Sequence, residues 1–462
     1  MERKNAWETY EEAQLKELEK ISNDYKKALD KGKTERECVK LTVDMARERG
    51  YRELNELIKE KKTIKAGDKV YVVGMEKSVV LFNIGTEPIE EGMNILGAHI
   101  DSPRMDVKQN PLYETEELTY LDTHYYGGIK KYQWVTIPLA IHGVVIKKDG
   151  TKIEVVVGEN ENDPVFAVTD LLIHLAAKQL EKTASVVIEG ENLDVLVGSK
   201  PVVADKEEKE KVKKGILTIL KEKYDFDEED FLSAELEVVP AEKARDLGFD
   251  RSMVIGYGQD DRVCAFTSLF AMLEEENVKR TSCLILVDKE EIGSVGATGM
   301  HSRFFENMIA ELLYLMGEEA ELKVRRALAN SKMLSSDVSA AYDPLFPEVF
   351  EKRSSAFFGK GLVFNKFTGA RGKSGSNDAN AEYLAKLRQT LDDEKVNYQF
   401  AELGKVDAGG GGTIAYIMAN YGMEVIDSGV AVLCMHAPYE ITSKADIYEA
   451  YKGYKAFLRG IE

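Results

Sequence analysis

Apolar residues near the start of the chain recur at helical spacing over residues 6–29, which predicts an amphipathic helix. A second helical stretch covers Glu35–Glu60, with a break expected at Gly50. Three short apolar runs then predict strands at 70–73, 79–84 and 93–100.

From about Met253 onward, short apolar runs alternate with helical stretches. The expected strands are 282–288, 332–337, 362–367, 398–401 and 429–435. The expected helices are 261–276, 303–315, 377–390, 413–421 and 444–458. Alternation of this kind indicates an α/β layer with a largely parallel sheet.

The region between these two parts has a different pattern. Two β-branched runs, Thr136–Lys147 and Lys152–Val157, are separated by Lys148-Asp149-Gly150, which is a hairpin signal. A helix is expected over 166–180 and strands over 184–189 and 193–197. The pattern predicts an inserted domain at 105–245, between the two parts of an α/β domain at 1–104 and 246–462.

Length and charge narrow the class of protein. A chain of 462 residues suggests more than one structural unit. With 62 Lys and Arg against 81 Asp and Glu, the net charge of −19 argues against nucleic-acid and membrane-surface partners. No apolar run reaches the ~18 residues of a membrane helix, and residues 1–8 lack an apolar signal core. Four scattered cysteines suit a reducing compartment, so a cytoplasmic location is expected.

Five short motifs place histidines or carboxylates at the ends of expected strands or at the start of an expected helix. They are G-A-H-I-D-S-P at 97–103, Q-D-D-R at 259–262, D-K-E-E-I-G-S at 288–294, S-S-D-V-S at 335–339, and the histidine at 436. Each alone has an ordinary structural explanation, such as a helix N-cap, a turn or a structural His–Asp pair. Because open α/β sheets bind ligands at the carboxyl ends of their strands, the shared position favours one site.

The motifs together supply two imidazoles and three carboxylates, from His99, Asp260, Glu291, Asp337 and His436. This nitrogen and oxygen set suits Zn²⁺, Mn²⁺ or Co²⁺. Two metals ~3.5–4 Å apart can share one bridging carboxylate, each taking one further histidine and one further carboxylate. The inventory matches that need.

Two further carboxylates have candidate roles beside the metal ligands. Glu290 is left over as a general base. Asp101 lies two residues beyond His99 on a strand, so the two side chains share a face and Asp101 can accept the second imidazole N–H. The residues alone leave open a metallo-aminopeptidase, another two-metal amide hydrolase such as a deacylase or carboxypeptidase, and a binding protein with a relict site.

The ordered motifs, with M-H-A-P-Y-E at 435–440, Y-G-G at 126–128 and D-L-L-I-H-L at 170–175, resemble the aspartyl-aminopeptidase family of dinuclear zinc exopeptidases. The likeness covers nearly the whole chain. It implies an α/β fold, in which a phosphorylase/hydrolase-like catalytic domain with a mixed, mostly parallel sheet is interrupted by a β-rich dimerisation domain. It also implies an aminopeptidase that removes the N-terminal residue from short peptides.

The resemblance implies two divalent metal ions per chain, zinc first, with cobalt or manganese as alternatives. His99 and Asp337 would hold one ion, Glu291 and His436 the other, and Asp260 would bridge both.

The resemblance also implies roles outside the ligand set. Glu290 would be the general base and Asp101 would orient His99. In related proteins, a histidine of the inserted domain enters the active site of a neighbouring subunit, and the matching position is His174. The implied assembly is a homo-oligomer, a tetrahedral dodecamer built from dimers.

The chain departs from family members that prefer acidic N-terminal residues. Their D-x-A-H-A-x-H-P pattern is D-V-S-A-A-Y-D-P at 337–344, without the histidines. The lysine of their G-P-V-I-K-x-N strand is shifted by one residue to Lys366, and such a shift reverses the face of a strand. Lys366 and Arg371 remain candidates for substrate binding, and selectivity for acidic residues stays open.

Overall fold

The computed structural model describes residues 4–202, 209–369 and 371–461, and the chain divides into two compact units. The first unit comprises Met1–Asp101, Ala244–Met435 and Glu440–Glu462, and the second comprises Ser102–Lys243 and His436–Tyr439. This division differs from the expected domain boundaries by a few residues at each end and by the short segment 436–439.

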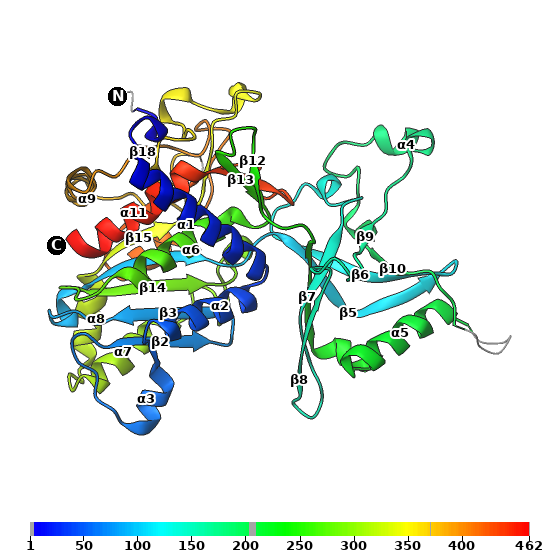
Figure 1. Cartoon of the computed structure of the whole chain (residues 1–462), viewed down its shortest axis with the longest axis horizontal. Coiled ribbons are helices and arrows are strands. Elements are labelled where there is room, and N and C mark those ends of the chain that lie inside the picture. Colours follow the sequence, from blue (N-terminus) through cyan, green and yellow to red (C-terminus); the bar gives the residue numbers. More distant parts are fainter. Residues whose placement is uncertain (1–3, 203–208, 370, 462) are drawn as a thin grey trace. The chain divides into compact units, whose positions relative to one another are not determined.

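The first unit is built on a nine-stranded sheet (Figure 1). In spatial order its strands are β1 (Arg52–Glu53), β2 (Lys69–Gly74), β3 (Ser78–Asn83), β14 (Thr281–Val287), β4 (Met93–His99), β15 (Lys332–Ser336), β19 (Glu424–Gly429), β17 (Leu362–Asn365) and β18 (Tyr398–Phe400). The four central strands β14, β4, β15 and β19 run parallel, whereas β3 and β17 run antiparallel to their inner neighbours. The predicted mixed, mostly parallel α/β fold is confirmed.

Helices cover both faces of this sheet. One face packs against α1 (Glu12–Lys31), α2 (Glu35–Glu48), α6 (Gln259–Glu274), α9 (Ala381–Asp393) and α11 (Lys444–Gly460). The other packs against α3 (Leu54–Glu60), α7 (Phe304–Leu315), α8 (Glu321–Ala329) and α10 (Ala415–Ala419). Along β3, Val79 and Leu81 enter the first core while Val80 and Phe82 enter the second. A strand buried on both faces is apolar throughout, which explains the continuous runs in the sequence.

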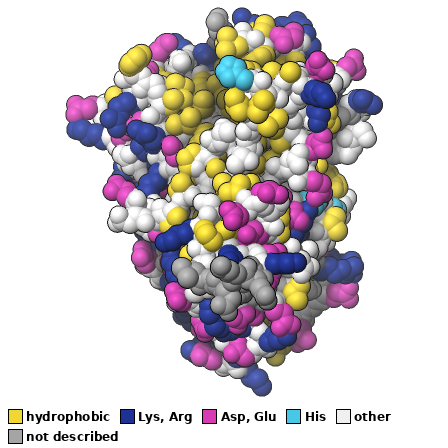
Figure 2. All heavy atoms as spheres, turned by 90° about the vertical axis from the view of Figure 1, so that its right-hand side faces the viewer, with side chains coloured by type: hydrophobic (Ala, Val, Ile, Leu, Met, Phe, Trp, Pro, Cys, Tyr) yellow, Lys and Arg dark blue, Asp and Glu magenta, His cyan; other side chains and the backbone are white. Residues whose placement is uncertain are grey.

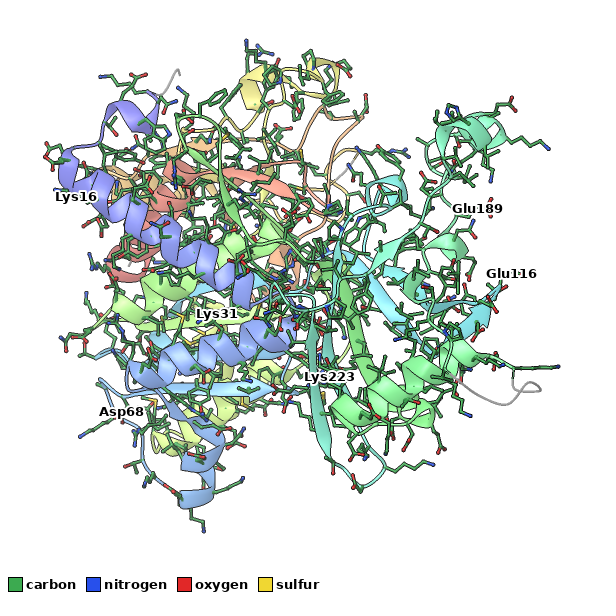
Figure 3. The ribbon with its side chains drawn as sticks, turned by 45° about the vertical axis from the view of Figure 1, so that its right-hand side comes forward. Lys16, Lys31, Asp68, Glu116, Glu189 and Lys223 are labelled. Atoms are coloured by element: carbon green, nitrogen blue, oxygen red, sulfur yellow. The ribbon has the colours of Figure 1, made fainter. Side chains whose placement is uncertain are left out.

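The N-terminal helices differ slightly from their predicted limits. Ala6–Glu8 forms a short 3-10 turn, and α1 begins only at Glu12. Figure 3 labels Lys16 and Lys31 along α1. The break expected at Gly50 is confirmed, because α2 ends at Glu48 and Gly50 has a φ of +85°.

A smaller five-stranded sheet completes the first unit. Its strands are β12 (Arg245–Leu247), β13 (Met253–Gly256), β21 (Glu440–Ser443), β20 (Ala431–Leu433) and β16 (Ser339–Ala340). The single strand expected over 429–435 is therefore divided, since its first part belongs to β19 and its second to β20.

The second unit is a seven-stranded antiparallel sheet. Its order is β8 (Lys152–Val157), β7 (Leu139–Ile146), β11 (Ala234–Pro240), β5 (Arg104–Thr115), β6 (Leu118–Tyr126), β10 (Val195–Gly198) and β9 (Ala167–Val168). The hairpin predicted around Lys148-Asp149-Gly150 joins β7 and β8. Figure 3 marks Glu116 in the turn between β5 and β6, and Lys223 near the end of α5 (Lys211–Tyr224).

Two predictions for the second unit are wrong. The helix expected over 166–180 contains only β9, a 3-10 turn at Ile173–Leu175 and the four-residue α4 (Ala177–Leu180). The strand expected over 184–189 is absent from this described stretch. Most large apolar residues of this segment are exposed, whereas Val168 and Ala176 are buried, so their spacing does not follow the burial of a helix face. No helix in the described ranges combines the length and apolar character needed to cross a bilayer.

Candidate metal centre

Three neighbouring parallel strands bring the predicted residues to one edge of the nine-stranded sheet. His99 is the last residue of β4, and it lies opposite Val287 at the end of β14. Glu290 and Glu291 follow β14 in a 3-10 turn, and Asp337 follows β15. The strands end level with one another, so residues far apart in sequence share one edge.

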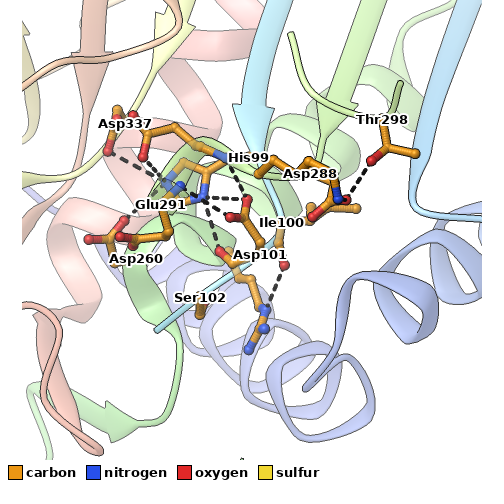
Figure 4. A network of polar contacts seen from close by, with 12 residues as sticks. His99, Ile100, Asp101, Ser102, Asp260, Asp288, Glu291, Thr298 and Asp337 are labelled. Carbon is orange, nitrogen blue, oxygen red and sulfur yellow. Dashed lines mark hydrogen bonds and ion pairs between the residues drawn. The ribbon is translucent and has the colours of Figure 1, made fainter. Parts of the chain in front are cut away.

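Carboxylate side chains from several segments surround the His99 imidazole. Its Nε2 lies 3.2 Å from Asp260 Oδ1, 3.9 Å from Asp337 Oδ1 and 4.0 Å from Glu290 Oε2 (Figure 4). Glu291 joins the group, because His99, Glu290 and Glu291 offer ligand atoms within 4.8 Å of one another. Asp260 enters from the first turn of α6. Five predicted residues of the first unit therefore converge.

Asp101 holds two parts of this centre together. The Nδ1 atom of His99 lies 3.0 Å from the Asp101 carbonyl oxygen and 3.4 Å from its Oδ1. The same carboxylate accepts the backbone N–H groups of Glu290, at 3.2 Å, and Glu291, at 3.1 Å. Asp101 is fully buried. Beyond the contact with His99 that the sequence suggested, its carboxylate also anchors the turn that carries both glutamates.

Backbone and side-chain bonds also fix the helix start that carries Asp260. The Glu440 carboxylate accepts the Asp260 N–H at 2.9 Å. The neighbouring Gln259 donates from Nε2 to the Glu440 carbonyl and accepts from Tyr25 and Thr442. Sequence analysis assigned no role to Glu440, although it closes the same M-H-A-P-Y-E motif as His436. Its position four residues beyond a candidate ligand was the available signal.

The charge balance of the cluster is unfavourable without a cation. Burial and the nearby Glu290 carboxylate raise the pKa of Asp337 well above its usual value, against the opposing charge of His99. Burial also raises the pKa of Asp261. Burial disfavours the charged form of His99, yet its contacts with Asp101 and Asp260 raise its pKa well above the usual value. Carboxylates crowd together here and compete for one imidazole.

The donor set fits a divalent metal. His99 is 1% exposed, and among the described residues its Nε2 has no hydrogen-bond partner. A buried polar atom left in this state usually marks a missing water or ion. Imidazole and carboxylate donors without thiolate suit zinc, and a contact from Nδ1 to a carbonyl or carboxylate is the usual support of a metal-binding histidine.

The four further predicted residues are His436, His174, Lys366 and Arg371. His436 is in the second unit, where its Nδ1 lies 2.7 Å from the Gly128 carbonyl oxygen. His174 is exposed in a 3-10 turn of that unit. Lys366 and Arg371 are exposed in the first unit. Lys366 follows β17, which runs antiparallel to β19 and so ends away from the edge that carries the ligands.

An α/β sheet with imidazole and carboxylate donors gathered at its strand ends defines a metal-dependent hydrolase centre. A family model described as "Aminopeptidase I zinc metalloprotease (M18)" matches residues 28–458. The chain belongs to this M18 family of zinc metallopeptidases.

Similar proteins agree with this placement. A relative from Clostridium acetobutylicum, named "Probable M18 family aminopeptidase 1", is 63% identical over 457 residues, covering 99% of this chain and 98% of the relative. The crystal structure of an M18 aminopeptidase from Thermotoga maritima has a TM-score of 0.94 at 42% identity and covers 100% of both chains. The S. cerevisiae mApe1 dodecamer shares the fold, with a TM-score of 0.75 at 20% identity over 95% of this chain and 96% of that one.

The chain is accordingly a zinc-dependent aminopeptidase, a hydrolase. The predicted family, fold and activity are confirmed. The comparisons favour the aminopeptidase over the alternative of a deacylase or carboxypeptidase.

Proposed function

We propose that the centre binds two zinc ions per chain and removes the N-terminal residue of short peptides. The observation that supports this proposal most strongly is the convergence of five predicted residues around the buried Nε2 of His99, which has no hydrogen-bond partner in the described part of the chain. These residues are His99, Asp260, Glu290, Glu291 and Asp337. In this proposal His99 and Asp337 hold one ion and Glu291 belongs to the other. Asp260 would bridge the two ions; it shares a group of ligand atoms with His99 and Asp337, and its Oδ1 lies 3.2 Å from His99 Nε2.

His436 is proposed as the second imidazole ligand. Its Nδ1 faces a carbonyl oxygen, which can only accept, so Nδ1 carries the proton and Nε2 keeps the lone pair that a metal needs. The segment 436–439 is short and is flanked on both sides by first-unit residues, Met435 and Glu440. Glu440, four residues beyond His436 in the sequence, accepts the Asp260 N–H, which agrees with a second ligand at position 436.

The protein groups divide the chemistry between them. Bound zinc supplies Lewis acidity, which lowers the pKa of a water molecule to about 7 and polarises a carbonyl. Glu290 takes a proton from the attacking water on a carboxylate oxygen and later gives it to the leaving amine. Asp101 holds the His99 imidazole and the turn of Glu290 and Glu291 in fixed positions relative to one another. The substrate's free α-amine binds beside the carboxylates, which restricts cleavage to the N-terminal residue.

Zinc stoichiometry tests the two-ion proposal. Purified wild-type protein should bind two zinc ions per chain in a calorimetric titration, with cobalt or manganese as weaker substitutes. His436→Gln should bind one. His142→Gln is the matched control, since this buried histidine pairs with Glu159 in the second unit and should leave the count at two. One ion in wild-type protein, or two in His436→Gln, would contradict the assignment.

A substrate panel tests the reaction and its selectivity. Peptides with a free N-terminus should be cleaved, and the same peptides with an N-acetyl group should not. Asn365, at the position of the family lysine, is buried and donates to the Ser339 hydroxyl at 3.0 Å, so no cation occupies that face of β17. Neutral N-terminal residues should therefore be cleaved at least as fast as acidic ones. Binding of acidic residues by Lys366 and Arg371 remains the alternative, and a strong preference for Asp or Glu would support it.

We also propose that the enzyme is a homo-oligomer, with His174 serving a neighbouring copy. His174 is flanked by Leu171, Leu172, Ile173 and Leu175, each more than half exposed. Figure 2 shows hydrophobic side chains grouped in places on the face it views. Contiguous apolar exposure of this kind marks a protein interface. The mApe1 dodecamer makes the same assembly a candidate for this chain, from dimers to a tetrahedral dodecamer.

Light scattering and subunit mixing test the assembly. A monomer would exclude the role of His174. If His174 acts on a neighbour, His174→Ala and Glu290→Gln chains, each inactive alone, should regain part of the activity when they are refolded together. Mixtures that stay inactive would place His174 outside the active site.

All four cysteines are free thiols, and three are buried. Free thiols are typical of a reducing compartment, so a cytoplasmic location is part of the same proposal.

A further inference from the structure

Behind Glu290 and Glu291, the chain closes a loop that returns to the end of β14. The Asp288 N–H donates to the Thr298 carbonyl at 3.2 Å, and the Thr298 hydroxyl donates to Asp288 Oδ2 at 2.6 Å (Figure 4). Asp288 is 1% exposed and Thr298 is 5% exposed. Two bonds between the same pair of residues therefore fasten the loop at its base, away from solvent.

Lys289 fastens the same loop a second time. Its Nζ donates to Asp288 Oδ2 at 2.9 Å. Its side-chain stem lies over Gly296, where an added Cβ would stand 3.1 Å from Lys289 Cε. The Lys289 carbonyl accepts the Ser294 N–H at 2.7 Å. The residue immediately before Glu290 is thus held by its backbone and by its side chain.

Lys289 also supplies positive charge to an acidic region. Its ammonium pairs with the buried Asp288 carboxylate at 2.9 Å, and the charges of Glu35 and Asp101 also act on it. Glu35 is 2% exposed in the first turn of α2. Lys289 therefore supplies a cation to a group of buried carboxylates.

We propose that Asp288, Lys289 and Thr298 form a clamp that positions the turn carrying Glu290 and Glu291. Asp101 holds the two backbone N–H groups of this turn from one side, and the clamp fixes its entry and the return of the loop from the other. The inference rests on the proposed function, because it takes Glu290 as the base and Glu291 as a ligand. The three residues act through this turn and are positioning residues.

The sharpest test is Thr298→Val, which keeps the shape of the side chain and removes the hydroxyl bond. A small displacement of a base can cost up to about 100-fold in rate, so we expect kcat to fall about tenfold with KM unchanged. Zinc affinity, measured by competition with a chromogenic chelator, should fall about tenfold, as is usual when a ligand loses its support. Thr298→Ser restores the donor and should return both values to within about threefold of wild type.

Thr123→Val is the matched control. Thr123 is 1% exposed, and its hydroxyl donates to the Leu193 carbonyl at 2.6 Å in the second unit. This variant loses a bond of equal length and should lose similar thermal stability, while kcat and zinc affinity stay at wild-type values. Equal losses of kcat in both variants would mean that the Thr298 bond contributes only to folding stability, and this result would overturn the proposal.

Lys289→Met gives a second, independent variant that keeps the aliphatic stem. It should lower zinc affinity and kcat at least as much as Thr298→Val, because Asp288 and Glu35 then lose their cation. Wild-type zinc affinity in both variants would overturn the clamp. Zinc affinity is measured without substrate, so an absence of peptidase activity in wild-type protein would reject the proposed function and leave this test intact.

Discussion

Two sets of buried carboxylates in the first unit are partnered in opposite ways. In the first set, Asp260 at the start of α6 and Asp337 after β15 face the His99 imidazole and one another's negative charge. At the start of α11, Asp446 is 0% exposed and accepts the N–H groups of Gly359 and Gly361, both at 2.8 Å.

The difference teaches how to tell a ligand site from a structural anchor. Burying a carboxylate is costly unless hydrogen-bond donors or a cation compensate for the lost water. The protein provides donors for Asp446, which fixes the loop before β17. It crowds carboxylates around His99, and such a cluster becomes favourable when a divalent cation neutralises it. Burial alone does not separate the two cases, but the nature of the partners does.

The largest expected effect is on kcat, and it concerns Glu290, which lies beside the first set of carboxylates. Glu290→Gln removes the proposed base while keeping the size and one acceptor oxygen of the side chain. General base catalysis contributes about 10²–10⁴-fold, so kcat should fall about 10³-fold. KM and zinc content should stay close to wild type, measured by steady-state kinetics and metal analysis. Near-normal turnover would remove Glu290 from the mechanism.

The second set should respond to pH through folding stability. Burial raises the pKa of Asp446 to about 7, although the bonds from Gly359 and Gly361 oppose this. A folded-state pKa above the unfolded value means that the folded chain binds the extra proton, so stability falls as pH rises from about 4 to about 7. Asp446→Asn abolishes this titration. Between about pH 4 and about pH 7, the free energy of unfolding of wild-type protein should therefore fall by up to about 4 kcal/mol relative to that of the variant.

Urea unfolding of Asp446→Asn and wild-type protein at pH 5 and pH 8, with saturating zinc, measures that difference. The variant should gain stability relative to wild type on going to pH 8. The loss of one acceptor for the glycine N–H groups lowers its stability equally at both pH values and cancels. A pH-independent difference would show that Asp446 is already ionised in the folded protein at pH 5.

Zinc affinity should distinguish two substitutions of the same kind, Asp260→Asn and Asp446→Asn. Asp260→Asn removes a negative ligand from the centre, and zinc affinity should fall by at least about 100-fold. Asp446→Asn is the matched control, a buried Asp-to-Asn change in the same unit, and it should leave zinc affinity unchanged. Chelator competition measures both. Equal affinities would contradict the bridging role of Asp260.

The smallest effect concerns stability on zinc addition. A ligand that binds only the folded state at about 100 times its dissociation constant stabilises by about 2.7 kcal/mol. That amount is the contribution of one site, so wild-type protein and Asp446→Asn should both gain at least this much in urea unfolding, and Asp260→Asn should gain far less at the same zinc concentration. A similar gain in all three would mean that zinc stabilises through another site.

The sequence alone determined much of this protein. Periodicity located most strands and helices of the first unit, because strands buried on both faces are continuously apolar. Motif position then indicated that His99, Glu291 and Asp337 would meet, since parallel strands end at one edge. The inserted region was harder to predict, and the exposed apolar segment around His174 imitated a buried helix face.

Only the tertiary structure decided which groups stand behind the ligands. The bonds of Asp101 to Glu290 and Glu291, of Thr298 to Asp288, and of Glu440 to Asp260 join segments whose local patterns carry no trace of one another. Local periodicity records whether a side chain is buried. It does not record what that side chain meets, because the partners come from other strands and helices that packing brings together.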